Sequence, residues 1–259
     1  PPPWSALTSA GHTVTFATPE GGDTPQTDQR VLDGYLFGLI RASPETREIY
    51  RRMKEDSASF NNPLPFDEIV PGDFDGLVLP GGHDAATSPY LESHSLQAKV
   101  RQFWKTGRPV AAVCHGVLVL SRAGVFSGGG AAAAEGGVGA APPVVRTTAV
   151  TRQMERFAYH LTRPFYGDYH LSTTWPRYTQ DEIEEENPGG SLTFEAGSPN
   201  PLHPVWHGSA TDHRRSHVVE DGHYLSARFP GDVWTWALRF GVKVTEPHAA
   251  AIVTDGQSY

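Results

Sequence analysis

The sequence predicts an α/β fold in which a doubly wound parallel sheet is sandwiched by helices, with a small helical or loop cap. Short apolar segments that end at glycine or proline alternate with segments of helical period. The connections between successive strands hold about a dozen residues or more, which is the length that parallel strands need for a crossover. The 259 residues suffice for a single large domain, which we place at residues 1–244, with a tail at 245–259.

The N-terminal part predicts one strand and two helices. Residues 13–18 alternate, contain β-branched side chains and end at a turn over residues 19–22, so they predict a strand. Residues 31–40 and 45–54 follow a helical period. The many charges of the second segment indicate a surface helix.

The central part continues this alternation. Residues 74–79 predict a strand that breaks at residues 80–83, and residues 89–104 predict a helix. Residues 110–113 form another short apolar run and predict a second strand. A helix is expected from residue 117 onward, because the chain passes there through a tight turn.

The last part combines irregular segments with recognisable elements. The Gly/Ala/Pro-rich residues 127–143 predict a flexible surface insertion. A strand at 144–150 and a helix at 151–161 follow, and the polar, aromatic-rich residues 162–215 predict the cap. Asp221-Gly222 between two apolar runs indicates a β-hairpin, and a last helix is expected to end near Phe240.

Composition excludes several classes of protein. There are 21 Lys and Arg against 29 Asp and Glu, a formal net charge of −8, which argues against non-specific nucleic-acid binding. No apolar run reaches the roughly 18 residues that a membrane span needs. The single cysteine excludes an internal disulfide and favours a reducing compartment, so a cytoplasmic location is expected. The start at Pro1-Pro2-Pro3 without an initiator methionine indicates a trimmed or incomplete N-terminus.

Cys114 is the strongest candidate for chemistry. The segment Ala112-Val113-Cys114-His115-Gly116 places a nucleophile between small residues where a strand turns into a helix, a geometry that needs small neighbours. The helix N-terminus favours thiolate, the attacking species, over thiol. The alternative is a small buried apolar side chain, which is the usual role of a lone cysteine.

Two further positions complete the candidate site. The Pro80-Gly81-Gly82-His83 turn also follows a strand, so its amides at Gly82 and His83 are candidates for an oxyanion hole. His115 is a candidate general acid or base, with a solvent-facing helix-start residue as the alternative. His203 and His207 have the spacing of two metal ligands on one helix face, but Pro204 between them disfavours a helix there. Neither a metal nor a cofactor is therefore expected.

These motifs resemble the ThiJ/PfpI superfamily, which has the class I glutamine amidotransferase-like, flavodoxin-like fold. The resemblance rests on residues 10–21, 75–83, 109–116 and 226–232 and covers most of residues 4–125 and 145–242. Members of this superfamily include glutathione-independent glyoxalases, stress chaperones, proteases, hydratases and inactive homologues, and the resemblance implies the glyoxalase III or stress-chaperone branch. A homodimer is expected by the same analogy.

The resemblance also implies two acids that this sequence does not supply in the usual places. In the family, a Glu after the first strand contacts the cysteine; residues 1–7 match the helix that follows, and Glu20 is a candidate stand-in, or else only a turn residue. A second acid, which orients the histidine, is expected after the strand that follows the elbow, where Arg152 or Gln153 stands. That acid is left unassigned.

The leading functional hypothesis is a Cys114-dependent lyase or hydrolase. It would act on a small carbonyl compound in the manner of a glyoxalase III, which converts methylglyoxal to lactate without glutathione. The alternatives are a non-catalytic stress, redox-sensing or chaperone-like protein in which Cys114 is oxidised, or a glutamine amidotransferase. The last is disfavoured because no His followed two residues later by Glu occurs downstream of the cysteine. A small molecule is the expected partner, without nucleic acid or membrane.

Overall fold

The computed structural model describes residues 1–34, 41–127, 145–171, 174, 176–187, 192–198 and 208–246. Its centre is a four-stranded sheet in the order β3 (Leu77–Leu79), β4 (Val110–Val113), β8 (Tyr224–Ala227) and β7 (Val218–Asp221). β3, β4 and β8 are parallel, and β7 pairs antiparallel with β8. The predicted α/β class with a parallel sheet is confirmed, as is the hairpin at Asp221-Gly222, where Gly222 has a φ of 57°.

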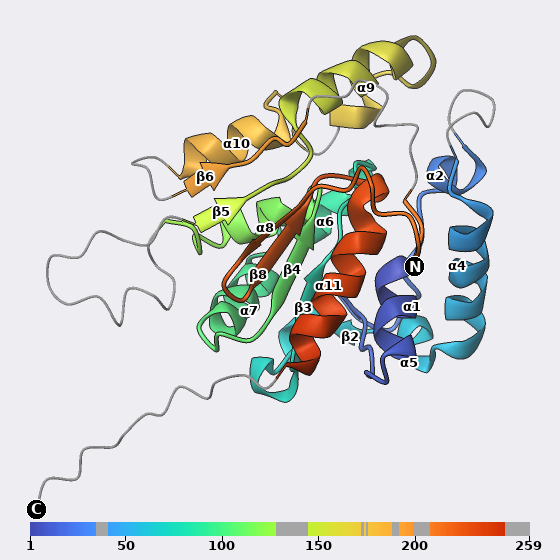
Figure 1. The fold of residues 1–259 in the computed structure, drawn as a ribbon, viewed down its shortest axis with the longest axis vertical. Helices are drawn as coiled ribbons and strands as arrows, with labels where there is room; N and C mark the ends of the chain where they lie inside the picture. The colour runs from blue at the N-terminus through green and yellow to red at the C-terminus, as the bar shows by residue number, and fades with distance from the viewer. Residues whose placement is uncertain are drawn as a thin grey trace, which may run out of the picture.

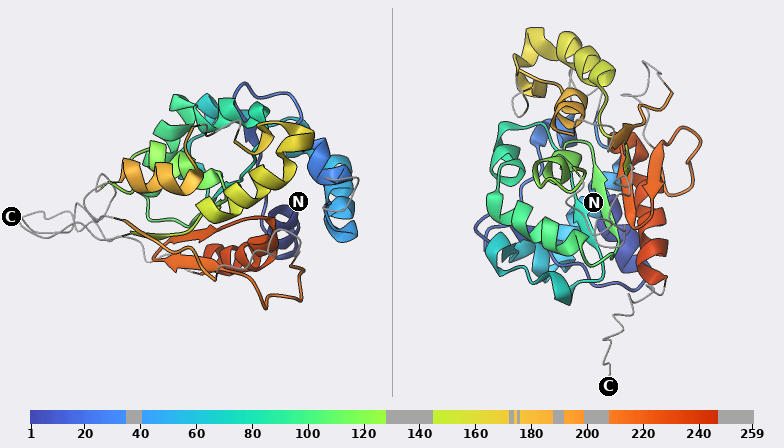
Figure 2. Two further views of the ribbon diagram at one scale, coloured as in Figure 1. Left: turned by 90° about the horizontal axis from the view of Figure 1, so that it is seen from above. Right: turned by 90° about the vertical axis from the view of Figure 1, so that its left-hand side faces the viewer.

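Helices cover both faces of this sheet (Figures 1 and 2). Val110 and Ala112 of β4 belong to an apolar cluster that includes α7 (His94–Trp104) and α8 (Gly116–Arg122). Ala111 and Val113 point the other way, into a cluster with α1 (Pro2–Ser9) and α11 (Val233–Thr245). Since side chains alternate along a strand, an apolar residue at every position of β4 requires a helical layer on each side.

The N-terminal elements form an additional edge. β1 (Ala17–Thr18) pairs in parallel with β2 (Leu64–Pro65) in a separate two-stranded sheet, flanked by α2 (Gln29–Asp33), α4 (Pro44–Asp56) and α5 (Ala58–Asn61). The strand predicted at 13–18 is shorter than expected, since the amide of Phe16 donates to the hydroxyl of Ser59 and not to a strand. The helix predicted at 45–54 is confirmed, whereas most of the one predicted at 31–40 lies outside the described residues.

The predicted helix at 89–104 is two helices. α6 (Ser88–Leu91) ends before Ser93, whose hydroxyl accepts the amide hydrogen of Leu96 and starts α7 afresh. A side-chain cap of this kind satisfies a backbone donor that would otherwise have no partner at the start of a helix. The described residues also contain short 3-10 turns at Phe66–Glu68, Pro71–Asp73, Ala85–Thr87, Tyr169–Leu171 and Pro230–Asp232.

The cap lies above the sheet at the top of Figure 1. It begins before the predicted residues 162–215, because α9 (Arg152–Tyr166) belongs to it together with α10 (Thr179–Glu186). The parallel pair β5 (Val145–Thr147) and β6 (Leu192–Phe194) lies next to these helices. The predicted helix at 151–161 is confirmed and extends further, and the strand at 144–150 is shorter than predicted. The predicted insertion at 127–143 lies outside the described residues except for Ser127. α11 continues to Thr245, so the last helix is longer than predicted, and the rest of the predicted tail at 245–259 lies outside the described residues from 247 onward.

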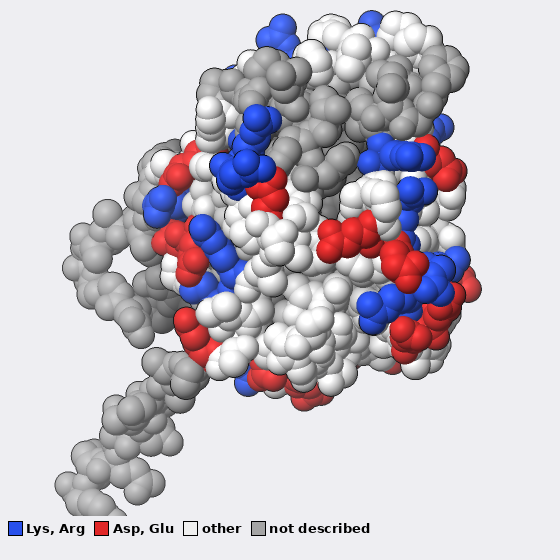
Figure 3. Space-filling view, turned by 45° about the vertical axis from the view of Figure 1, so that its right-hand side comes forward, with Lys and Arg blue, Asp and Glu red and all other residues white. Residues whose placement is uncertain are grey.

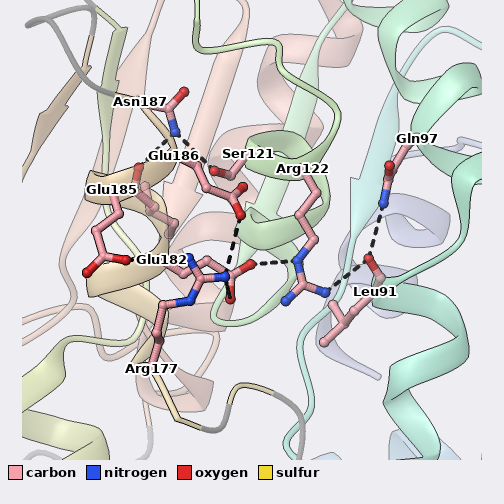
Figure 4. Close-up of polar contacts among 10 residues, drawn as sticks. Leu91, Gln97, Ser121, Arg122, Arg177, Glu182, Glu185, Glu186 and Asn187 are labelled. Atoms are coloured by element: carbon pink, nitrogen blue, oxygen red, sulfur yellow. Dashed lines mark hydrogen bonds and ion pairs between the residues drawn. The ribbon is translucent and has the colours of Figure 1, made fainter.

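Polar contacts join the cap to the domain (Figure 4). The Nε of Arg122 in α8 lies 2.6 Å from Oε1 of Glu182 in α10, and the Nδ2 of Asn187 donates to Oγ of Ser121 over 3.0 Å. Glu182 is almost fully buried, and Arg177 supplies a second, more distant cation at 3.7 Å. The helix that begins at the cysteine elbow is therefore tied directly to α10.

The surface shows charges of both signs. In Figure 3, groups of acidic and basic side chains lie next to one another on the face shown, with uncharged surface between them. On α4, Arg51 pairs with Glu48 and Glu55, all three exposed. In the part of the chain that the structure describes, no helix combines the length and apolarity that crossing a bilayer requires.

Candidate active site

The backbone at Cys114 has the strained geometry of a nucleophile elbow. Its φ is 56°, and it is the non-glycine residue with a positive φ among the described residues. This left-handed conformation costs a residue with a side chain about 1–2 kcal/mol, so it persists only where the surroundings enforce it. Cys114 lies between the end of β4 and the start of α8, as the sequence predicts.

Two glycines allow the elbow to form. A Cβ on Gly116 would lie 2.2 Å from the carbonyl oxygen of Leu79 and 2.6 Å from that of Pro80. A Cβ on Gly81 would lie 2.6 Å from the Cβ of Cys114. The loop after β3 and the turn after β4 are therefore in direct backbone contact, which accounts for the small residues seen in both motifs.

Cys114 and His115 form a buried pair. Sγ of Cys114 lies 3.4 Å from Nδ1 of His115, and the two residues are 5% and 1% exposed. On the other side of the ring, Nε2 of His115 lies 3.2 Å from Oε1 of Glu155, an ion-pair contact without the alignment of a hydrogen bond. The three side chains form the series Cys114, His115 and Glu155.

Electrostatics favour a charged His115. Burial opposes the charged ring, but the neighbouring Cys114 sulfur and the Glu155 carboxylate outweigh it and raise the pKa of His115 to about 10. An imidazolium at neutral pH stabilises a thiolate beside it. The pair therefore has the arrangement of an activated nucleophile with its proton donor.

Glu155 supplies the carboxylate that faces His115. It lies one turn into α9 and is 4% exposed. Its carboxylate accepts the amide hydrogen of Thr179 over 2.7 Å and the hydroxyl hydrogen of the same residue over 2.9 Å. Because Thr179 begins α10, the helix N-terminus adds a favourable partial charge to these bonds. They fix the carboxylate that faces His115.

Two more histidines lie near His115. The His83 ring lies 5.4 Å from the His115 ring and 4.8 Å from the His170 ring, measured between centroids. Burial, with His115 and His170 nearby, holds the pKa of His83 well below its usual value. Burial and the charge on His115 lower the pKa of His170 to about 4. Both rings are therefore neutral at pH 7, and His170 comes from the predicted cap.

The structure brings together four of the five residues named from the sequence. Gly82 and His83 follow β3, beside the Cys114-His115 turn, in keeping with the position expected of an oxyanion hole. Glu20 lies exposed in the turn after β1, which pairs with β2 and not with the sheet of β4. The carboxylate found against His115 is that of Glu155, so the position left unassigned after the elbow is filled two or three residues beyond Arg152 and Gln153.

Sequence reasoning missed Glu155, although one signal indicates it. Thr151 caps α9, and Glu155, Tyr159 and Thr162 form its buried stripe at the spacing of one helix face. A glutamate on the buried stripe of an otherwise amphipathic helix is anomalous, because a buried carboxylate needs partners. The same reasoning could not have identified His170, because it lies in a short 3-10 turn that has no periodic pattern.

Parts of this chain are similar in sequence to known proteins. This chain is 35% identical to the deglycase TK1284 of Thermococcus kodakarensis over 100 residues, which cover 36% of this chain and 59% of that protein. It is 38% identical to the protein/nucleic acid deglycase 2 of Escherichia coli over 76 residues, which cover 29% of this chain and 42% of that protein. The chain thus matches less than two thirds of the length of these relatives.

The fold is shared more widely than the sequence. The crystal structure of glyoxalase III from Candida albicans superposes with a TM-score of 0.59 at 17% identity, covering 94% of this chain and 83% of that one. The family model described as ThiJ/PfpI family-like matches residues 2–181, which include the elbow, the loop after β3 and Glu155. On this match and the shared fold, the chain belongs to the ThiJ/PfpI family.

Proposed function

We propose that the protein is a cysteine-dependent enzyme that acts on a small carbonyl compound, with glyoxalase III-like conversion of methylglyoxal to lactate as the specific reaction. The observation that carries the proposal is the buried series of Cys114, His115 and Glu155 beside the loop of Gly82 and His83. A nucleophile, a proton carrier and an orienting acid are the parts that covalent catalysis requires. The likeness to a glyoxalase III fold and to proteins named deglycases supports the same class of chemistry.

The reaction begins with the sulfur. The Cys114 thiolate adds to the aldehyde carbon of methylglyoxal, and a C–S bond forms while the carbonyl electrons move to oxygen. The amides of Gly82 and His83 stabilise that oxyanion. His115 gives the oxygen its proton, which yields a hemithioacetal.

Two proton transfers then complete an internal redox change. The neutral His115 takes the proton from the former aldehyde carbon, and the neighbouring ketone carbon receives a proton through an enediol, so that the first carbon is oxidised and the second reduced. The product is a lactoyl thioester on Cys114. Water hydrolyses it and restores the thiol, so the net reaction adds one water to methylglyoxal and gives lactic acid. No external oxidant or reductant is consumed.

The test is lactate formation from methylglyoxal in the absence of glutathione. Wild-type protein is expected to produce lactate, and Cys114→Ser to lose on the order of 10³-fold or more in kcat/KM, because the alcohol is a far weaker nucleophile. His94→Gln, an exposed histidine at the start of α7, is the matched control and should keep full activity. Lactate production that survives in Cys114→Ser would eliminate the mechanism.

A further inference from the structure

Three metal-binding atoms converge at the elbow. One ring nitrogen each from His83 and His115 and the sulfur of Cys114 all lie within 4.8 Å of one another. The residues come from two loops, one after β3 and one after β4, that the contacts of Gly81 and Gly116 hold together. A thiolate with two imidazoles is a donor set that suits Zn²⁺.

We propose that His83, Cys114 and His115 bind a Zn²⁺ ion, with the Cys114 sulfur as one of its ligands. The inference goes beyond the proposed function and departs from the sequence-based expectation of no metal. His203 and His207, the pair considered from sequence, lie outside the described residues. His83 precedes Cys114 by 31 residues along the chain, so only the fold brings it to the adjacent Cys114 and His115.

The distances fit a tetrahedral ion. With Zn–N bonds of about 2.0–2.1 Å and a Zn–S bond of about 2.3 Å, a nitrogen and a sulfur ligand lie roughly 3.5 Å apart. Sγ of Cys114 and Nδ1 of His115 are 3.4 Å apart, so this edge already has the required length. The His83 nitrogen has to approach by about 1 Å to complete the triangle. The residue as a whole is partly exposed, but its Nδ1 is buried and its ring packs against Tyr169 and His170, so the approach requires a small shift of that ring within its contacts.

Glu155 prepares His115 for this role. It faces Nε2, on the opposite side of the ring from the nitrogen that faces the sulfur. Histidine ligands of metal ions commonly direct their second nitrogen to a carboxylate, which fixes the ring and makes the ligating nitrogen more basic. The bonds from Thr179 hold that carboxylate in place. The contacts that would hold His115 as a metal ligand are therefore present in the protein before any metal binds.

Binding displaces a proton. The ion takes the place of the proton that the Cys114–His115 pair holds, and that proton passes to solvent; no electron is transferred. Three protein ligands leave the fourth position to water, as in zinc sites that keep an open coordination place.

The experiment uses Co²⁺ as a spectroscopic probe for the site. After treatment with chelator, the full-length protein is titrated with Co²⁺, and Zn²⁺ affinity is measured by competition with a chromophoric chelator. We expect one Co²⁺ per chain with a thiolate-to-cobalt charge-transfer band and tetrahedral d–d bands, displaced by Zn²⁺. No turnover is measured, so failure of the proposed reaction and failure of the metal site are told apart.

Variants assign the ligands. Cys114→Ser should abolish the charge-transfer band, and His83→Gln should weaken Zn²⁺ binding by at least about tenfold, with Glu155→Gln weakening it by roughly the same factor through its effect on His115. His94→Gln is the control and should bind as wild type does. X-ray absorption of the Zn²⁺-loaded wild type adds a measurement that needs no variant, with one sulfur expected at about 2.3 Å. A missing charge-transfer band, a zinc shell without sulfur, or unchanged affinity in a folded His83→Gln would overturn the proposal.

Discussion

Thr179 donates two hydrogen bonds to the carboxylate of Glu155, one from its amide and one from its hydroxyl. The same carboxylate faces His115, so the first residue of α10 holds the acid of the candidate site. The carboxylate that faces His115 is therefore held by a residue that bonds to the acid and not to the ring.

This relationship predicts a positioning role for Thr179. Thr179→Val removes the hydroxyl donor, leaves the amide bond, and should lower kcat/KM for methylglyoxal by about tenfold with about 1–2 kcal/mol of lost stability. Because the acid acts through His115, the loss should lie in kcat and be accompanied by an altered pH profile. Thr162→Val on α9 is the matched control: that hydroxyl is also buried but bonds to the carbonyl of Ala158. Equal losses in both variants would contradict the role.

A second prediction concerns the protonation of His115. In chelator-treated protein with labelled histidine, NMR should show His115 titrating near pH 10, and Glu155→Gln should lower that midpoint because one of the two negative partners is gone. The sign for stability follows. A histidine whose pKa is raised on folding stabilises the folded state fully below its unfolded-state pKa of about 6.5. For His115 this stabilisation is lost as the pH rises through about 10.

The corresponding measurement is the free energy of unfolding at pH 7 and pH 10. Wild type should lose more stability over this interval than His115→Gln, by at most about 1.4 kcal/mol per pH unit. A His115 resonance that titrates at the pH of free histidine would contradict the charged pair.

The glycine contacts at the elbow predict a steep stability effect. In Gly116→Ala the new methyl group would meet the carbonyl oxygens of Leu79 and Pro80, which are backbone atoms and cannot move aside. We expect a loss of about 2–3 kcal/mol or more in chemical denaturation. Gly72→Ala, where a Cβ meets nothing within 4 Å and φ is ordinary, should change stability by less than about 0.5 kcal/mol. Similar values for the two variants would argue against close packing at the elbow.

The buried ion pair between Arg122 and Glu182 predicts that the cap depends on charge pairing. Arg122→Met leaves Glu182 buried with only the more distant Arg177, and we expect a loss of about 2–4 kcal/mol. The double variant Arg122→Met with Glu182→Gln should recover part of this loss, because no uncompensated charge remains. Arg51→Met, which breaks an exposed pair on α4, should cost less than about 1 kcal/mol. A harmless Arg122→Met would show that the pair contributes little.

The elements of the central sheet could be predicted from the sequence because their signals are local. Residues 110–113 are apolar throughout and form β4 with the predicted bounds, and Asp221-Gly222 forms the predicted hairpin. The elbow at Cys114 could likewise be predicted, since its glycine and the tight turn follow one another in the chain. The ends of helices were harder to predict. Ser93 divides one predicted helix into two, because its hydroxyl accepts the amide hydrogen of Leu96 and starts a new helix there.

The rest of the site could not be predicted because it depends on contacts between distant segments. Glu155 meets His115 across 40 residues, and its own partner Thr179 lies 24 residues further on. His170 reaches His83 only because a short turn of the cap folds over the sheet. Glu20, in contrast, has a suggestive place in the sequence and lies exposed in a turn, since the strand before it joins a different sheet.

The burial of β4 on both faces has a consequence for how the site opens. Amide hydrogens of Ala111 and Ala112, with no exposed surface at either residue, belong to the part of a domain that exchanges with solvent only on global unfolding. α9 buries mainly polar side chains, so local opening should reach it earlier. The sulfur thus follows a strand that should exchange only on global unfolding, while the carboxylate beside its histidine lies on a helix that should open earlier, so a brief opening of α9 would separate Glu155 from His115 and leave Cys114 in place.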